Sequence, residues 1–382
     1  MKKKSILILL TLMTIIALTL MTILGQFDKL KVQTAATPEK PLRIGIVRLT
    51  HTHVHWLLGR PSSDDIKIVG IVEPNRKLAQ KYAKEHGYSM DIVFDTMDEM
   101  IKKTQPEAVC AFGSIYEHLG VVEKCAPLGI HVMVEKPLAV SMDHAQKMEA
   151  LAQKHHIQLL TNYETTWYAT NKKAWQYLNE ENKVGDLRKI VFHTGHSGPI
   201  EIGCNPEFTD WLLDPVLNGA GVLTDFGCYG ADITTWLMKG KKPQSVTCIT
   251  QHIKPDLYPK VEDECTILLT YPKTQVIIEA SWNWPFNRKD MEVYGQHGSF
   301  ICEDRNSLNY RWKNMDQPSK EKIPENAAPY NDPFSFLAAV ISKKITPAAF
   351  DLSSLETNMI VMEILEAAKK SAKTGETVIL KQ

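Results

Sequence analysis

Short apolar runs alternate with amphipathic stretches over the first part of the chain. The stretches between the runs have the residue spacing of helices, for example Arg76–Glu85 and the segment that begins near Ser141. The apolar runs are Leu42–Val47, Ile66–Val72, Ala108–Phe112, Ile130–Val134 and Ile157–Leu160. This alternation predicts a doubly wound α/β domain, in which a parallel sheet is joined by right-handed crossovers.

After about Tyr163 the pattern changes to strands with few intervening helices. A loop rich in Gly and Pro precedes the runs Ser245–His252, Glu264–Tyr271, Gln275–Trp282 and Asp290–Tyr294, and a final helix covers about Ser353–Thr374. These runs predict an α+β domain with a mostly antiparallel open sheet. We therefore divide the chain into a Rossmann domain (42–162), a substrate and oligomerisation domain (163–350) and a C-terminal helix with its tail (351–382).

The first 25 residues have a different character. Lys2, Lys3 and Lys4 precede a nearly charge-free apolar stretch, Ile6–Leu24, which is the layout of an export signal. The stretch is longer than a usual signal core, so an uncleaved membrane anchor is the alternative. We expect an exported protein that is periplasmic, or anchored and facing the periplasm, with residues 26–41 as a linker.

Composition excludes several classes of protein. The chain is 44% hydrophobic and 23% charged, which describes a globular protein, and it carries 44 basic and 44 acidic residues. Loss of residues 1–25 would leave 41 basic against 44 acidic residues, without a basic patch for nucleic acid. The seven cysteines are scattered and lack C-x-x-C spacing, which argues against a zinc site and a dense disulfide framework.

Glu135-Lys136-Pro137 closes the apolar run that ends at Val134. In an open parallel sheet the carboxyl ends of the strands face the ligand crevice, so Lys136 is a candidate for acid–base chemistry. Burial and neighbouring charge can lower the pKa of such a lysine toward its working pH. The alternative is a solvated Glu-Lys pair that ends a strand before a helix.

The first strand lacks the G-x-G-x-x-G turn that binds dinucleotides. Arg48, Thr50 and His53 stand at the three glycine positions. Glu73, however, lies at the end of the second strand, where an acid commonly binds the ribose hydroxyls of NAD and disfavours the 2′-phosphate of NADP. Its alternative interpretation is a solvated turn residue before Pro74.

His51, His53 and His55 form an H-x-H-x-H pattern. In a strand these three side chains would share a face, but in a turn that enters a helix they would not, so we expect no metal site. His51 can instead donate a hydrogen bond to a phosphate and so help to replace the missing glycines.

Two segments together resemble one family. The segment Gly129–Leu138, which contains Glu135-Lys136-Pro137, is followed about ninety residues later by Gly219-Ala220-Gly221, Asp225 and Tyr229. This pairing is similar to that of the glucose–fructose oxidoreductase / inositol dehydrogenase / MocA family over about residues 42–375. Many members carry histidine at the position of Tyr229, but tyrosine occurs in the glucose–fructose oxidoreductase and dihydrodiol dehydrogenase branches.

The resemblance implies hydride transfer between a nicotinamide and a sugar or polyol. Lys136 matches the family's catalytic lysine, and Tyr229 would be the proton donor and acceptor, with its pKa lowered by Lys136. Asp225 would orient the lysine or the substrate hydroxyl, although it could also be the N-cap of the helix that follows. The resemblance also implies a homo-oligomer formed through the C-terminal sheet.

The expected ligands of these residues follow from the same resemblance. NAD would contact residues around the ends of the parallel strands, namely Arg48, Thr50, His51, His53, Glu73, Asn75, Phe112, His118, Glu135, Lys136 and Pro137. The end of the sixth strand departs from the family, which often has an arginine near Glu164. We expect substrate contacts there from Tyr163, Glu164, Trp167 and Tyr168; Trp211, Trp282 and Trp284 also offer faces that suit pyranose rings.

The function that these features favour is an exported NAD-dependent oxidoreductase acting on a sugar, glycoside or polyol. Because free NAD is scarce outside the cytoplasm, we expect a tightly bound cofactor that is regenerated within each catalytic cycle. A glycoside hydrolase that oxidises the sugar transiently is one alternative. The other is a non-catalytic carbohydrate-binding protein that has lost the cofactor, as the missing glycines suggest.

Overall fold

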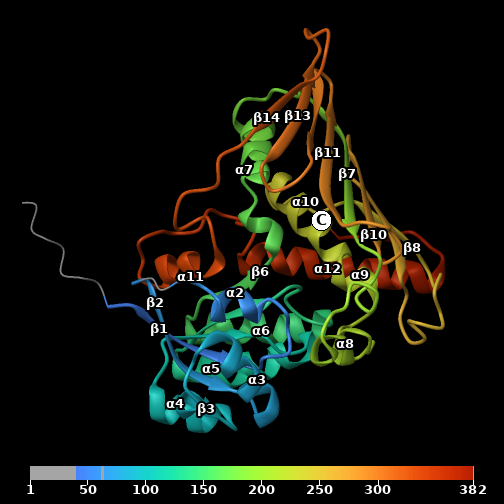
Figure 1. Cartoon of the computed structure of the whole chain (residues 1–382). Helices are drawn as coiled ribbons and strands as arrows, with labels where there is room; N and C mark the ends of the chain where they lie inside the picture. The colour runs from blue at the N-terminus through green and yellow to red at the C-terminus, as the bar shows by residue number, and fades with distance from the viewer. Residues whose placement is uncertain (1–39, 62–63, 382) are drawn as a thin grey trace, which may run out of the picture. The chain divides into compact units, whose positions relative to one another are not determined.

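The computed structural model describes residues 40–61 and 64–381 (Figure 1). From Pro41 onward the chain packs as one compact unit. The predicted export signal or anchor (1–25) and nearly all of the linker lie outside the described residues and stay predictions. None of the described helices has the length and apolar character needed to span a membrane.

Six parallel strands form the first sheet, in the spatial order β3-β2-β1-β4-β5-β6. They are β1 (Leu42–Val47), β2 (Ile66–Val72), β3 (Val93–Phe94), β4 (Ala108–Ala111), β5 (His131–Glu135) and β6 (Leu159–Asn162). This topology confirms the predicted doubly wound sheet. The strand order reverses between β1 and β4, and ligands of such sheets bind at this switch point, beyond the carboxyl ends of the strands.

Helices follow these strands, and local sequence explains where they begin and end. They are α2 (Val54–Leu58), α3 (Arg76–His86), α4 (Met97–Thr104), α5 (His118–Cys125) and α6 (Met142–His155). The side chain of Asn75 caps α3 by accepting the N–H of Leu78, and Ser141 caps α6 in the same way at His144. Gly87 ends α3 with a φ of 77°, a left-handed conformation that glycine adopts without a steric cost.

The second sheet has nine strands in the order β14-β13-β12-β11-β7-β10-β9-β8-β15. They are β7 (Leu187–Gly195), β8 (Ser245–Gln251), β9 (Glu264–Thr270), β10 (Gln275–Ser281), β11 (Arg288–Gly295), β12 (Gly298–Cys302), β13 (Ser307–Trp312), β14 (Ser319–Lys322) and β15 (Val378–Ile379). The pair β7–β10 is parallel and the other described pairs are antiparallel, as predicted. Helices α10 (Gly227–Leu237) and α12 (Leu355–Thr374) pack against this sheet (Figure 1).

The loop between β7 and α10 contains two short helices that the sequence pattern did not predict, α8 (Pro206–Leu212) and α9 (Val222–Asp225). α8 contacts the first domain, because Glu207 Oε1 accepts hydrogen bonds from Tyr82 Oη at 2.7 Å and Lys81 Nζ at 3.0 Å. Further along, the carbonyl of Leu217 accepts the N–H of Tyr116 at 3.0 Å. The loop is therefore attached to the first domain at two places.

Helix α11 (Pro333–Ile341) was also not predicted, and its packing does not follow chain order. Its Phe334, Phe336 and Leu337 are buried in the same hydrophobic cluster as Ile44 of β1. Chain order places these residues in the predicted second domain (163–350). Their burial instead stabilises the first sheet, because removing apolar side chains from water lowers the free energy of the folded chain.

Asp232 of α10 is fully buried, and neither of its carboxylate oxygens has a hydrogen-bond partner among the described residues. Burial raises its pKa well above the usual range, and Asp351 adds to this shift. Because the pKa of Asp232 is higher in the folded than in the unfolded chain, its contribution to the free energy of unfolding is most favourable below the pKa of the unfolded chain, near 4. This contribution decreases as the pH rises toward the pKa of the folded chain.

We therefore expect the melting temperature of Asp232→Asn, relative to the unsubstituted protein, to rise by about 2–4 °C between pH 4 and pH 7. Thermal unfolding followed by circular dichroism at both pH values measures this difference. Asp143→Asn is the matched control, because Asp143 lies on the surface and pairs with Lys147. A difference for Asp232→Asn that does not change with pH would mean that the carboxyl is ionised in the fold.

Candidate active site

Lys136 follows the last residue of β5 and is held by Asp225. Its ammonium donates to Asp225 Oδ1 at 2.5 Å and to the Asp225 carbonyl at 2.8 Å, and both residues are buried. Trp282 Nε1 donates to the other carboxylate oxygen at 3.1 Å. Asp225 therefore orients the lysine, one of its two predicted roles. It is not the N-cap of α10, because Phe226 occupies that position.

The pKa of Lys136 is raised, not lowered as burial alone would suggest. Burial disfavours the ammonium, but the charge of Asp225 and its hydrogen bond outweigh that effect. The same pairing holds the pKa of Asp225 below its usual range. Lys136 and Asp225 thus form a fixed, buried pair of opposite charges.

Tyr229 lies on α10, four residues after Asp225, which is the last residue of α9. Its ring centroid is 5.2 Å from Lys136 Nζ, and its hydroxyl has no hydrogen bond to any described residue. The prediction that Lys136 lowers the pKa of Tyr229 is wrong for this arrangement. Burial raises that pKa well above its usual value, and the charge of Glu164 raises it further.

Lys289, at the start of β11, is a second cation beside Tyr229, which the sequence did not reveal. Its Nζ lies 5.1 Å from the ring centroid of Tyr229 and forms an ion pair with Glu164. This pair keeps the pKa of Glu164 at about 2, although burial opposes the shift. Lys289 is surrounded in sequence by other charged residues and has no motif, so only the fold brings it to Tyr229.

The four predicted substrate residues divide into two groups. Tyr163 and Trp167 are buried: the hydroxyl of Tyr163 donates to Asn358, and Trp167 Nε1 donates to Asn162. The ring of Tyr163 supports its neighbours and presents no open face to a sugar, whereas Trp167, although buried, is among the residues that line a pocket between α2 and α11. Glu164 and Tyr168 lie nearer to Tyr229, and Tyr168 Oη donates to Glu164 at 2.6 Å. Among the further aromatic candidates, Trp282 is fully buried and Trp211 is 5% exposed.

The turn after β1 keeps an unusual backbone conformation without glycine. Arg48 has a φ of 68°, in the left-handed region that normally favours glycine. Its side chain pairs with Glu117 at 2.8 Å. The N–H groups of Thr50 and His51 both donate to the carbonyl of Phe112, so the turn is tied to the end of β4.

Glu73 is buried at the end of β2. One carboxylate oxygen accepts the N–H of Leu49 at 3.0 Å and the other accepts that of Asn75 at 2.9 Å. Glu73 therefore ties the turn after β1 to the turn after β2. Each oxygen keeps a lone pair that can accept a further hydroxyl.

His51, His53 and Glu135 meet at the ends of β1 and β5, with candidate ligand atoms within 4.8 Å of one another. His53 Nδ1 donates to Glu135 Oε2 at 2.8 Å, and Asn162 holds the other oxygen of Glu135. His51 Nδ1 accepts the N–H of His53, which places the ring proton of His51 on Nε2. The atom that faces Glu135 at 3.9 Å is therefore a donor, which is the wrong form for a metal ligand.

The third histidine of the pattern, His55, lies elsewhere, with His86 at 2.8 Å. His118 is buried at the start of α5, and its Nδ1 donates to the carbonyl of Leu138 at 3.1 Å. Burial lowers the pKa of His118 to about 4. Pro137, between Lys136 and Leu138, is also buried and follows a cis peptide bond.

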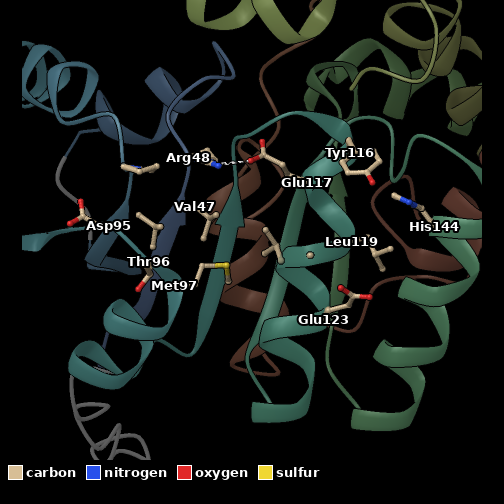
Figure 2. Close-up of a pocket in the computed structure, with 14 residues that line it drawn as sticks. Val47, Arg48, Asp95, Thr96, Met97, Tyr116, Glu117, Leu119, Glu123 and His144 are labelled. Atoms are coloured by element: carbon tan, nitrogen blue, oxygen red, sulfur yellow. Dashed lines mark hydrogen bonds and ion pairs between the residues drawn. The ribbon is translucent and has the colours of Figure 1, made fainter. Parts of the chain in front are cut away.

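A pocket of about 490 Å³ lies along β1, β2, α4 and α5 (Figure 2). Val47 and Val72 are among the apolar residues that line it. Figure 2 shows the Arg48–Glu117 pair at its border. Thr96 and Tyr116 line two other sides. The pocket adjoins the strand ends at which doubly wound domains hold nucleotides.

The residues at the carboxyl ends of the parallel strands fit a dinucleotide. Nε2–H of His51 and Nε1–H of Trp211 are buried donors without partners among the described residues, and their rings stack at 5.7 Å. Buried donors without partners are costly, so two of them side by side are suited to an acceptor such as a phosphate oxygen. Glu73 and Arg48 would lie toward the adenosine end, and Lys136 toward the nicotinamide.

Two family models match the chain over most of the described region. Residues 42–163 match the model described as an oxidoreductase family with an NAD-binding Rossmann fold, and residues 173–301 match the Gfo/Idh/MocA C-terminal domain. The chain therefore belongs to the Gfo/Idh/MocA family of oxidoreductases, and its N-terminal domain is of the NAD-binding Rossmann type.

Curated relatives are distant. Trans-1,2-dihydrobenzene-1,2-diol dehydrogenase of Xenopus tropicalis is 24% identical over 220 residues, which cover 57% of this chain and 61% of the relative. 1,5-anhydro-D-fructose reductase of Ensifer adhaerens is 22% identical over 53% of this chain and 59% of the relative. The matches thus span about three fifths of the length of these relatives.

Solved structures share the fold. Aldose–aldose oxidoreductase of Caulobacter crescentus, crystallised with glycerol, has a TM-score of 0.74 at 19% identity and covers 89% of this chain and all of that chain. An inositol dehydrogenase homologue of Azotobacter vinelandii, complexed with NADH and myo-inositol, also has a TM-score of 0.74, at 14% identity, over 89% of this chain and 98% of that chain. At these identities the likeness establishes the architecture alone.

Proposed function

We propose that the protein is an exported NAD-dependent oxidoreductase that acts on a hydroxyl group of a sugar, glycoside or polyol. One observation carries the proposal: the ammonium of the buried Lys136–Asp225 pair lies 5.2 Å from the ring centroid of Tyr229, whose hydroxyl has no partner among the described residues. A fixed cation next to a free phenol, at the ligand end of a parallel sheet, is suited to moving a proton to and from a substrate oxygen.

Each residue of this group has a distinct role in the proposed reaction. Tyr229 Oη exchanges the proton with the reacting oxygen, and Lys136 stabilises the negative charge that develops there. Asp225, which accepts a hydrogen bond from Trp282, keeps the Lys136 ammonium in place. Lys289, which is paired with Glu164, adds a second positive charge near Tyr229. NAD, when bound, supplies the hydride acceptor or donor.

The packing of α8 on the turn after β1 supports a cofactor that stays bound between turnovers, as export would require. Phe208 and Trp211 of α8 pack on His51 at ring distances of 5.2 and 5.7 Å, and Glu207 fastens α8 to α3. A dinucleotide held beneath α8 would leave only after these contacts open. Slow release would allow one cofactor molecule to serve many catalytic cycles.

Purified exported protein should therefore release about one equivalent of nicotinamide dinucleotide when it is denatured. Absorbance and mass spectrometry of the supernatant identify and quantify it. If none is released, calorimetric titration with NAD and NADH shows whether the site binds added cofactor. Failure of both measurements would overturn the oxidoreductase proposal and favour a carbohydrate-binding protein without cofactor.

A further inference from the structure

A second pocket, of about 590 Å³, lies between α2 and α11 and is separate from the crevice of Figure 2. Trp56 of α2 and Phe334 of α11 are among its apolar walls, and Glu164 and Arg305 are among its polar ones. Trp56 is 38% exposed although one face of its indole stacks on His53 at 3.7 Å. An exposed tryptophan held rigid from behind in a pocket is a ready platform for a ligand.

Two chains of contacts join this pocket to the proposed acid–base site. Glu164 lines the pocket and binds Lys289, whose ammonium lies 5.1 Å from the Tyr229 ring. On the other side, Trp56 stacks on His53, which donates to Glu135, the residue before Lys136. A ligand in the pocket would thus contact Glu164, whose ion-pair partner Lys289 lies beside Tyr229.

The charges of the pocket are already balanced. Arg60 pairs with Asp65 and Asp332, and Arg305 pairs with Glu325. Glu164, in turn, pairs with Lys289. With every charged lining group neutralised by a neighbour, the pocket favours an uncharged polar ligand over a phosphorylated or acidic one.

We propose that this pocket is a subsite for a neutral sugar unit adjacent to the unit that reacts at Tyr229. The substrate would then be an oligosaccharide or glycoside in place of a free monosaccharide. An aromatic platform with hydrogen-bonding groups around it matches a pyranose, which has apolar faces and a polar edge. The volume lies within the usual range for small-molecule sites. This inference rests on the proposed function and names its class of substrate.

The test compares neutral mono- and disaccharides on the holoenzyme, using methyl glucoside, cellobiose and maltose as probes. We expect a disaccharide to have a higher kcat/KM than methyl glucoside. Trp56→Ala should lower the ratio of these two kcat/KM values about tenfold, while kcat/KM for methyl glucoside itself stays within twofold. Trp56→Phe should retain part of the preference. Tyr294→Ala, which removes an exposed aromatic ring from β11, is the matched control and should change neither value.

Calorimetric titration of the same sugars separates this inference from the proposed function. Disaccharide binding that is lost in Trp56→Ala, without turnover of any sugar, would refute the proposed oxidoreductase while supporting the subsite. Equal kcat/KM values for mono- and disaccharides, with no disaccharide binding, would overturn the subsite. A Trp56→Ala protein that loses NAD and treats both sugar classes alike would also overturn it, because the pocket would then hold the cofactor.

Discussion

Replacing Tyr229 by phenylalanine will lower kcat by about 10²- to 10⁴-fold, the range usually supplied by one acid–base group. The substitution removes only the hydroxyl, which has no hydrogen-bond partner among the described residues, so the packing of the ring against Tyr163 at 5.7 Å is kept. The melting temperature and the amount of NAD released on denaturation should stay unchanged. Steady-state turnover with an accepted sugar measures the effect.

Tyr271→Phe provides the matched control. The Tyr271 hydroxyl, which is buried, also has no partner among the described residues, and burial raises its pKa as well. It lies in the turn before β10, whereas Trp282, which contacts Asp225, follows the other end of that strand. We expect normal turnover from this variant. If Tyr229→Phe also kept normal turnover, another group would have to carry the proton, and the proposed site would be misplaced.

The parts of the site that could be predicted from the sequence are those fixed by local pattern. Lys136 ends an apolar strand, and the alternation of strands and helices assigns that end to the ligand side of a parallel sheet. Asp225 and Tyr229 are four residues apart at the junction of α9 and α10, so their closeness to each other also follows from the sequence. Their approach to Lys136 was given only by the family resemblance, because no local rule relates two segments ninety residues apart.

The parts that could not be predicted depend on contacts between distant segments. Lys289 reaches Tyr229 because β11 pairs with β7 in the middle of the second sheet, and neither strand carries a motif that indicates this pairing. α8 is held by Tyr82 and His51 of the first domain, which lie far away in sequence. The pKa of Tyr229 was predicted in the wrong direction, because its complete burial could not be read from the sequence.

Breaking the Lys136–Asp225 pair will affect stability as well as catalysis. Lys136→Met leaves the Asp225 carboxylate buried without its cation, and unpaired buried charges cost about 3–5 kcal/mol. For a chain of this size we expect the melting temperature to fall by roughly 5–15 °C. Turnover should fall by at least about 10²-fold, because the charge that supports the reacting oxygen is lost.

The double variant Lys136→Met/Asp225→Asn separates these two effects. The amide introduced at position 225 still accepts from Trp282 but carries no charge, so most of the lost stability should return, while turnover should not. Lys147→Met is the surface control: its pair with Asp143 is exposed, and the melting temperature should change by only about 1 °C.

The pH dependence of this stability gives an independent check. The pKa of Asp225 is lowered, so its contribution is present above the unfolded value near 4 and is lost as the pH falls. The pKa of Lys136 is raised, so its contribution is present below about pH 10 and is lost as the pH rises. The unsubstituted protein and Lys136→Met should therefore differ most in melting temperature between these limits. Recovery of turnover in the double variant would show that the ion pair serves the fold alone and that Tyr229 works without its neighbouring cation.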